Sequence, residues 1–434
     1  MMDFSRSARE NLLGPGPKPG TEKRRGVALA STLSRLSPLL LFAVPLHADD
    51  VVPKKIAGIV TEYRHNSHAD VIFTRLLNTD TLDGKGRTPG LQLVSLYVDQ
   101  FPKNDMARSL AAEHGFTLCN SIKDALTLGT DRLAVDGVII VAEHGNYPKS
   151  PTDQTVWPKR RFFSEVVDVF VKTGRVVPVF SDKHLADNVA DAVWLYETAR
   201  QHKIPLMAGS SVPGTWRKPA LDVPRDAELR DILVVSYGGL DSYGFHGLEF
   251  LQSLVERRRG GETGVASVQS FTGEAFWEAR RIGTIDRDFL DAVIKTSEPR
   301  AKVAERPLEE LVKDPIAFEI RYVDGVKGTL CHLNGAVSQW AAGWHTADGS
   351  TNLVKADLQE DRPFMHFTHM LAGIEKMMHT DNPTWPVERT LFSSVILNAG
   401  MTSRIRNGEV VPTPDLNRRY RSHWNWSQPE ERGR

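Results

Sequence analysis

Residues with acid–base chemistry follow three apolar runs in the first half of the sequence, at the point where each run ends. They are Glu62, Arg64, His65 and His68 after the first run, Glu143 and His144 after the second, and Asp182, Lys183 and His184 after the third. His246 and Glu249 lie in a fourth group further along the chain. Imidazole exchanges protons near neutral pH, and a carboxylate or an ammonium group can orient a substrate. These residue types predict an active cleft.

The same residues admit a metal-binding interpretation. Histidine and carboxylate side chains are common ligands of catalytic metal ions. His65 and His68 have the spacing of one helical face, and Glu62 lies just before them. Against this, Ser67 can cap a helix that begins at this point, and a single histidine can have a purely structural role. The metal site at Glu62, His65 and His68 is therefore the alternative to a cleft that holds no metal.

The apolar runs are typical of buried β-strands that alternate with helices. Strand-like segments are expected at 55–60, 91–99, 135–145 and 175–184, and helical apolar spacing at 67–77, 105–115 and 161–174. Continuous Val/Ile/Leu strands between helices indicate a parallel sheet that is covered on both faces. In such a doubly wound domain, ligands bind at the carboxyl ends of the strands, which is where the acid–base residues lie.

After about residue 210 the strands become longer and lie next to one another in the sequence. The predicted fold class is therefore α/β, with an N-terminal Rossmann-like doubly wound parallel sheet followed by an α+β domain with a mainly antiparallel sheet. We expect a leader at 1–48, a Rossmann-like dinucleotide-binding domain at 49–210, an α+β substrate and oligomerisation domain at 211–415, and a tail at 416–434.

The leader has the order of a secretory signal. A polar, basic stretch precedes the apolar segment SPLLLFAVPLHADD, in which the small residue Ala48 stands before two aspartates. The apolar core is much shorter than the ~20 residues that cross a bilayer, so no integral membrane segment is expected after its removal. Arg24-Arg25 is compatible with a twin-arginine signal. We expect an exported, periplasmic protein, and the alternative is a cytoplasmic protein with a disordered leader.

Bulk composition is that of an ordinary globular protein. The 434 residues are 41% hydrophobic and 25% charged, and 54 basic residues balance 54 acidic ones. A net charge of zero gives no sign of a nucleic-acid partner. The two cysteines match no metal-ligand spacing and no disulfide framework.

Several blocks of the sequence resemble the glucose–fructose oxidoreductase, inositol dehydrogenase and rhizopine-catabolism (Gfo/Idh/MocA) oxidoreductases. The segments LVSLYVD…VIIVAEH and RVVPVFSDKHLADNVADAVWLYETARQHKIPLMAGSS are similar to that family's first domain. YGGLDSYGFHGLEF is similar to its Gly-Gly…Asp…His segment, and PVERTLFSSVILNAGMTSRIRNGEVV to its closing helix and strand. The resemblance covers most of residues 54–412 in scattered blocks.

The resemblance implies hydride transfer between NAD(P) and a carbohydrate-like substrate, a sugar or cyclitol. In that scheme Lys183 orients the substrate hydroxyl, His246 removes its proton, and Asp241 is a further catalytic residue. His184, Tyr243 and Glu249 are implied to contact the substrate. The implied cofactor-binding residues are Gly58, Arg64, Asn66, Ser67, Asp99, Glu143 and His144. An acid such as Asp99 at the end of the second strand favours NAD over NADP. A homo-oligomer is also implied.

Three departures separate this chain from the family pattern. Only Gly58 remains of the glycine fingerprint, and the turn after it carries bulky residues. If a dinucleotide binds, Arg64, Asn66, Ser67 and backbone N–H groups must hold its phosphates. Ser242 stands where the family has an acid, with Asp241 one place earlier, and His184 replaces a proline. Two alternatives remain open: a metal- or NAD-assisted hydrolase, lyase or isomerase on the same frame, and a non-catalytic periplasmic binding protein.

Overall fold

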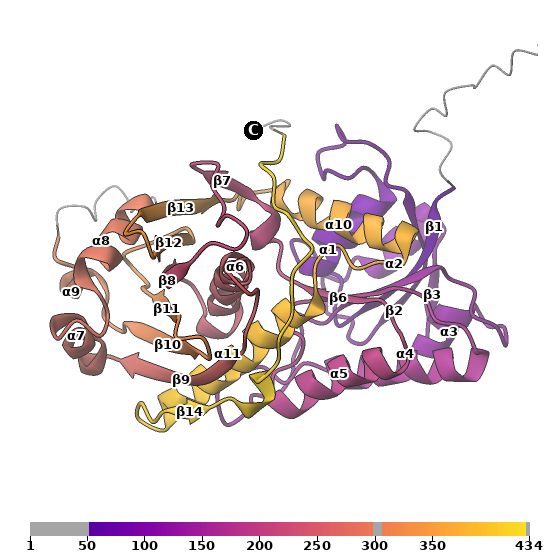
Figure 1. The fold of residues 1–434 in the computed structure, drawn as a ribbon. Coiled ribbons are helices and arrows are strands. Elements are labelled where there is room, and N and C mark those ends of the chain that lie inside the picture. The colour runs from indigo at the N-terminus through magenta and orange to yellow at the C-terminus, as the bar shows by residue number, and fades with distance from the viewer. Residues whose placement is uncertain (1–51, 298–305, 431–434) are drawn as a thin grey trace, which may run out of the picture. The chain divides into compact units, whose positions relative to one another are not determined.

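Six parallel strands form the first sheet of the chain (Figure 1). A computed structural model of the chain describes residues 52–297 and 306–430. The strands are β1 (Lys54–Val60), β2 (Leu91–Val98), β3 (Thr117–Cys119), β4 (Gly137–Val141), β5 (Val179–Asp182) and β6 (Leu206–Gly209). Their order in the sheet is β3-β2-β1-β4-β5-β6. The strand order reverses between β1 and β4, so the carboxyl ends of these two strands flank the position where doubly wound folds bind ligands. The predicted parallel sheet is confirmed.

Helices cover both faces of this sheet. The flanking helices are α1 (His68–Leu77), α2 (Ala107–His114), α3 (Ile122–Thr127), α4 (Lys159–Thr173) and α5 (Val189–Gln201). A sixth helix, α10 (His366–Thr380), comes from the C-terminal half of the chain and lies beside α1 in Figure 1. Its apolar residues, among them Met370, Ile374 and Met378, share one buried cluster with residues of β1, β4, β5 and α1. The N-terminal sheet is thus completed by a segment that is made about 310 residues after its first strand.

The second sheet has eight strands in the order β14-β9-β10-β11-β8-β12-β13-β7. The strands are β7 (Trp216–Lys218), β8 (Leu229–Ser236), β9 (Val265–Thr272), β10 (Ile316–Tyr322), β11 (Lys327–His332), β12 (Ala341–Thr346), β13 (Thr351–Asp357) and β14 (Val411–Pro412). All neighbouring pairs are antiparallel except β11 and β8. The predicted, mainly antiparallel second sheet is therefore also confirmed.

Both faces of the second sheet are covered within the chain. One face packs on α6 (Phe245–Val255) and α11 (Val387–Ile405), and the other on α7 (Glu274–Arg281) and α8 (Arg287–Thr296). The homo-oligomer that the family resemblance implied stays a prediction.

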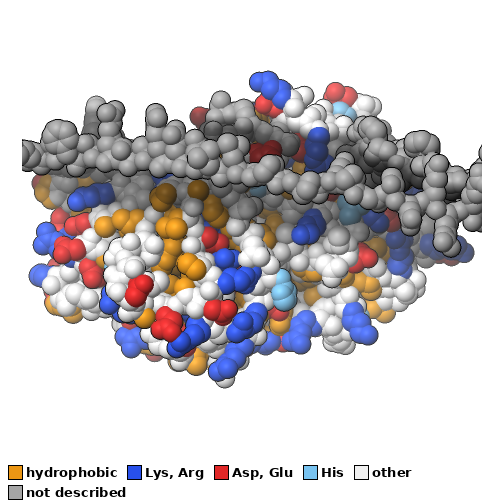
Figure 2. Space-filling view, turned by 45° about the horizontal axis from the view of Figure 1, so that its top comes forward, with side chains coloured by type: hydrophobic (Ala, Val, Ile, Leu, Met, Phe, Trp, Pro, Cys, Tyr) orange, Lys and Arg blue, Asp and Glu red, His pale blue; other side chains and the backbone are white. Residues whose placement is uncertain are grey.

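The C-terminal tail packs against the second sheet. Trp216 Nε1 donates to the backbone oxygen of Pro429, and Arg217 N donates to the side chain of Gln428. In Figure 1 this yellow segment runs alongside α11 toward β7. The predicted leader lies outside the described residues. Among the helices that are described, none has the length and apolar character to cross a membrane. Basic and acidic side chains are interspersed on the described part of the face in Figure 2.

Candidate active site

A cavity of about 330 Å³ lies at the carboxyl ends of β1, β4 and β5. Seven of the residues predicted for the site line it: Asn66, His68, Glu143, His144, Lys183, Tyr243 and His246. Trp340 adds an aromatic wall, and Glu360 and His366 close the cavity from the segment that leads into α10. The meeting of these side chains follows from the topology, because the ends of parallel strands share one edge of the sheet.

His68 is oriented by a buried carboxylate. Ser67 caps α1 by accepting a hydrogen bond from the backbone N–H of Asp70, so that His68 is the first helical residue. Its Nδ1 lies 2.6 Å from Oδ2 of Asp182, the last residue of β5. A carboxylate only accepts hydrogen bonds, so Nδ1 carries a proton, and in the neutral ring the lone pair lies on Nε2. This tautomer is that of a histidine general base.

His246 is a neutral imidazole beside a serine. Its Nδ1 lies 2.6 Å from Oγ of Ser210, which follows β6, and its ring centre lies 6.5 Å from that of His68. Burial, reinforced by the positive charge of Lys183, lowers the pKa of His246 well below its ordinary value. Trp340 and Tyr243 lie against it, with ring centres at 5.4 and 6.0 Å. His246 therefore offers a neutral donor or acceptor to a ligand.

Lys183 is held in an ion pair with Glu143. Its Nζ donates to Glu143 Oε1, and both side chains are almost fully buried. Burial favours a neutral carboxyl, but the charge of Lys183 outweighs it and keeps the pKa of Glu143 below its ordinary value. The neighbouring His144 is neutral, because burial lowers its pKa to about 4. The cavity thus contains one compensated ion pair and several neutral imidazoles.

Three predicted residues lie away from this cavity. His184 Nε2 lies 2.6 Å from the backbone oxygen of Asp241, and both residues line an adjacent cavity of about 390 Å³. Asp241 Oδ2 accepts a hydrogen bond from the backbone of Thr155. Glu249 is buried on α6, and burial raises its pKa to about 7. The structure therefore places Asp241, His184 and Glu249 in the wall behind the cleft.

The residues predicted for the cofactor are spread along the first sheet. Gly58 lies within β1, where an added Cβ would come within 2.6 Å of Leu96 Cδ1, so it serves strand and helix packing rather than the turn. Ser67 caps α1, and Arg64 pairs with Glu62 at 3.1 Å. Asp99 follows β2 and is hydrogen-bonded within the chain. None of these four side chains lines the main cavity.

The alternative metal ligands do not converge. Glu62 faces Arg64, His65 is 64% exposed, and His68 faces Asp182. Within residues 52–297 and 306–430, no group of three or more His, Cys, Asp or Glu side chains is arranged to hold a metal ion.

Sequence reasoning missed several residues that shape the site. Lys159, at the start of α4, donates to the backbone oxygens of Asp182 (2.5 Å) and Lys183 (2.8 Å), and so fixes the turn that carries both. Ser210 orients His246, and Tyr237 donates to Glu360 at the rim. Ser210 could have been found from its position directly after a predicted strand, which is the pattern that identified the other site residues. Lys159 gave no signal, because a lysine in the first turn of an amphipathic helix is usually solvated.

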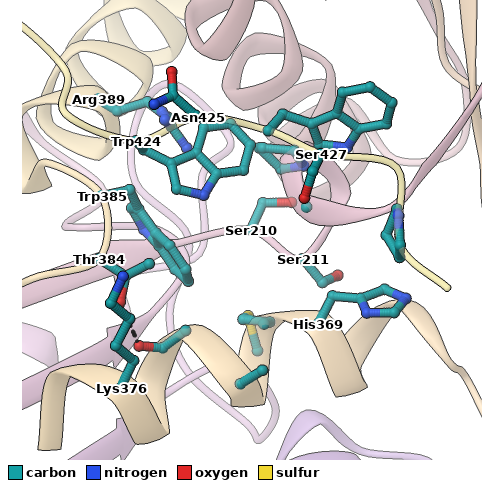
Figure 3. Close-up of a pocket in the computed structure, with 17 residues that line it drawn as sticks. Ser210, Ser211, His369, Lys376, Thr384, Trp385, Arg389, Trp424, Asn425 and Ser427 are labelled. Carbon is teal, nitrogen blue, oxygen red and sulfur yellow. Dashed lines mark hydrogen bonds between the residues drawn. The ribbon is translucent and has the colours of Figure 1, made fainter. Parts of the chain in front are cut away.

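A second cavity of about 310 Å³ lies on the other side of the Ser210–Ser211 segment (Figure 3). Trp385 and Trp424 lie on one side of it and His369 on the other, with the two serines between them. Trp424 and Trp426 come from the C-terminal tail. Ser211 also lines the main cavity, so one residue separates the two spaces.

Comparison with known proteins gives structural matches only. No protein-family model and no curated protein matches the sequence. Scyllo-inositol dehydrogenase from Lactobacillus casei is similar over 83% of this chain and 98% of its own, with a TM-score of 0.51 and 12% identity. The same enzyme with bound NAD(H) and scyllo-inositol matches with a TM-score of 0.51. GenD2 from gentamicin A biosynthesis, solved with NAD, is similar over 85% of this chain and 99% of its own, with a TM-score of 0.53 and 14% identity. The chain therefore has the fold of the inositol dehydrogenases and related Gfo/Idh/MocA oxidoreductases, as the sequence resemblance predicted.

Proposed function

We propose that this chain is an enzyme that removes a proton from a sugar or cyclitol bound in the main cavity. The observation that carries this proposal is the His68–Asp182 pair, in which Asp182 occupies Nδ1 of a histidine that lines a space of about 330 Å³ and leaves Nε2 as the acceptor. A general base must lie within hydrogen-bonding reach of the proton that it takes. Trp340 and Tyr243 supply apolar faces for a sugar ring, and neutral imidazoles and the Lys183–Glu143 pair supply partners for its hydroxyl groups.

Each polar group has a role in this proposal. His68 accepts the proton, and Asp182 stabilises the imidazolium that forms. His246, fixed by Ser210, hydrogen-bonds a neighbouring hydroxyl and supports the orientation of the ring. Lys183 stabilises the oxygen that loses its proton, while Glu143 keeps the ammonium group charged inside the protein. The base in this scheme is His68, whereas the sequence resemblance implied His246.

Oxidation at a hydroxyl-bearing carbon is the reaction class that the fold favours. The solved neighbours are dehydrogenases, and two of them hold NAD or NAD(H). An NAD(P)-dependent oxidoreductase acting on a sugar or cyclitol is thus the first form of the proposed function. The residues at the dinucleotide positions of this chain do not fit that cofactor in the usual way, because Asp70 and Asp99 are hydrogen-bonded within the chain.

A second form needs no hydride acceptor. In a sugar that carries a carbonyl group, the base can remove a proton from the carbon next to the carbonyl. The proton then returns to the former carbonyl carbon, which isomerises the sugar, or a hydroxyl group on the next carbon leaves as water, which is an elimination. The observation that favours this form is that the polar atoms expected to bind the dinucleotide are already paired within the chain.

The two forms are separated by one set of assays. Purified protein is incubated with a panel of cyclitols, sugars and keto-sugars, with and without NAD⁺ or NADP⁺. Formation of reduced nicotinamide indicates oxidoreduction, and exchange of carbon-bound protons with D₂O in the absence of dinucleotide indicates isomerisation or elimination. His68→Asn should abolish the activity, and His65→Asn, three residues away and exposed, is the matched control. The proposal is wrong if no compound of the panel binds or reacts.

We propose that the leader at 1–48 directs export of the protein to the periplasm. The order of basic, apolar and small residues in the leader supports this proposal. Fractionation of cells that express the full chain tests this. Recovery of the unprocessed protein in the cytoplasm supports the alternative.

A further inference from the structure

The N-terminus of α1 is already bound by the chain's own side chains. In Rossmann domains the backbone N–H groups at this point hold the diphosphate of the dinucleotide. Here the Asp70 carboxylate accepts the backbone N–H of Asn66 at 2.9 Å. Ser67 Oγ accepts the backbone N–H groups of Asp70 and Arg64, both at 3.2 Å. Three backbone donors around the start of this helix are thus used within the chain.

A negative charge also lies in the first turn of α1. Asp70 is fully buried, and although burial favours its neutral form, hydrogen bonds from Arg362 and Thr74 keep its pKa below the ordinary value. Asp70 is therefore ionised at neutral pH. Arg362 Nη1 lies 2.8 Å from this carboxylate and 3.1 Å from Asn66 Oδ1. Asp70 thus supplies the negative charge that a phosphate would otherwise bring. Arg362, from the segment before α10, compensates this charge.

The carboxylate expected to hold the adenosine ribose is occupied in the same manner. Asp99 Oδ1 accepts hydrogen bonds from the Tyr97 hydroxyl at 2.7 Å and from Arg161 Nη2 at 2.5 Å. Asp99 Oδ2 accepts a third from the Tyr147 hydroxyl at 2.6 Å. Three of the roughly four acceptor sites of this carboxylate are therefore used, so two ribose hydroxyls could not both bind Asp99 without displacing one of these donors.

Tyr147 is held over Asp99 by its own segment. It lies in the connection between β4 and α4, and the next residue toward β4, Asn146, exchanges two hydrogen bonds with Gln100. Asn146 N donates to Gln100 Oε1 at 2.9 Å, and Gln100 Nε2 donates to the Asn146 oxygen at 3.1 Å. The Tyr147 ring also packs against Trp157. This connection therefore covers the carboxyl end of β2.

The turn after β1 is filled as well. Tyr63 stands in the segment where a glycine fingerprint lets the backbone approach the diphosphate. Its ring is fully buried, and its hydroxyl lies 2.8 Å from Thr74 Oγ1 on α1. The side chain packs under the helix, so the turn is built around a large aromatic group.

We infer that this chain fills its own dinucleotide groove, with Asp70 and Arg362 at the diphosphate position and Tyr147 and Arg161 on Asp99, so that the cleft takes a hydroxylated ligand without NAD(P). The inference goes beyond the proposed function, which requires only that a base acts on such a ligand. It implies that the second, dinucleotide-independent form of the activity is the one that this chain carries out.

The test uses the full chain. Binding of NAD⁺, NADH, NADP⁺, NADPH and AMP is measured by isothermal titration calorimetry and by thermal shift. Scyllo-inositol dehydrogenase, whose structure holds NAD(H), is the positive control for the assay. We expect no saturable heat, and a change in Tm below about 1 °C at millimolar ligand, since stabilisation grows with the ratio of ligand concentration to Kd.

Two results overturn the inference. One is saturable binding of any of these dinucleotides with a Kd below about 0.1 mM. The other is a stoichiometric dinucleotide released when the purified protein is heat-denatured. Cyclitols and sugars are titrated in the same experiment. Dinucleotide binding together with cyclitol binding overturns the inference alone, whereas absence of any cyclitol, sugar or keto-sugar ligand overturns the proposed function.

Discussion

His68 Nδ1 lies 2.6 Å from the carboxylate of Asp182, which joins the first residue of α1 to the last residue of β5. The two residues are 114 positions apart in the sequence. Asp182 is almost fully buried, while His68 reaches the main cavity. The hydrogen bond to Asp182 orients His68 as a base. The sequence alone cannot distinguish such a histidine, at the start of a helix, from a surface residue.

Removing the carboxylate should therefore slow the reaction without unfolding the protein. Asp182→Asn keeps the size of the side chain but no longer fixes the tautomer of His68 or stabilises its charged form. We expect kcat to fall by about 10²–10⁴-fold, the usual contribution of general acid–base catalysis, with a small change in KM. Steady-state kinetics on the substrate found in the panel measures this. An unchanged kcat in a correctly folded variant would show that His68 is not the base.

The buried ion pair predicts a large effect on stability. Glu143→Gln leaves the Lys183 ammonium group in the interior without a counter-charge. Breaking a buried pair in this way costs about 3–5 kcal/mol of the free energy of unfolding. Urea denaturation checks the value. The double change Lys183→Met with Glu143→Gln removes both charges and should recover most of the loss, while activity stays absent.

Glu249 predicts a stability that falls with rising pH. Its pKa is raised from 4.5 to about 7 by burial, so between these values the folded state holds a proton that the unfolded state has lost. The contribution is fully present below pH 4.5 and is lost as the pH rises through 7. Across this window the difference in unfolding free energy between wild type and Glu249→Gln should change by about 3 kcal/mol. If the free energy of unfolding changed with pH in the same way in both proteins, the raised pKa would not belong to Glu249.

The tail should contribute to stability through its aromatic residues. Trp426 Nε1 donates to the backbone oxygen of Thr215 at 2.9 Å, and the Arg217 guanidinium lies 4.3 Å from its ring centre. Because the indole is half-buried, Trp426→Ala should lower the free energy of unfolding by about 2 kcal/mol, less than for a core tryptophan. His423→Ala, at an exposed position of the same tail, is the control and should change stability by less than about 0.5 kcal/mol.

The parallel sheet and the edge that carries the site could be predicted from the sequence. Continuous apolar runs identify buried parallel strands, and the residues after them must then share one edge, which brought His68, Glu143 and Lys183 to one cavity. The hydrogen-bond partner of Lys183 could not be predicted from the sequence. Whether Lys183 faces a ligand or Glu143 depends on the rotamers of two side chains from different strands, and no periodicity encodes that.

For a related reason, the sequence did not predict that side chains of the chain itself fill the dinucleotide groove. The missing glycines showed that the turn is unusual, but Tyr147 lies in an irregular connection whose path over Asp99 has no sequence pattern. Arg362 reaches Asp70 from 292 residues away. Contacts of this range depend on the complete tertiary structure.

The position of α10 has a consequence for synthesis of the protein. The face of the first sheet that α10 covers includes Ile56 and Met207, which are buried in the finished structure. A nascent chain that has just completed β6 would still expose this surface to the solvent, because Met370 and Ile374 have not yet left the ribosome. The N-terminal sheet must therefore wait for about 170 further residues, and a fragment ending at 210 should aggregate unless a chaperone shields it.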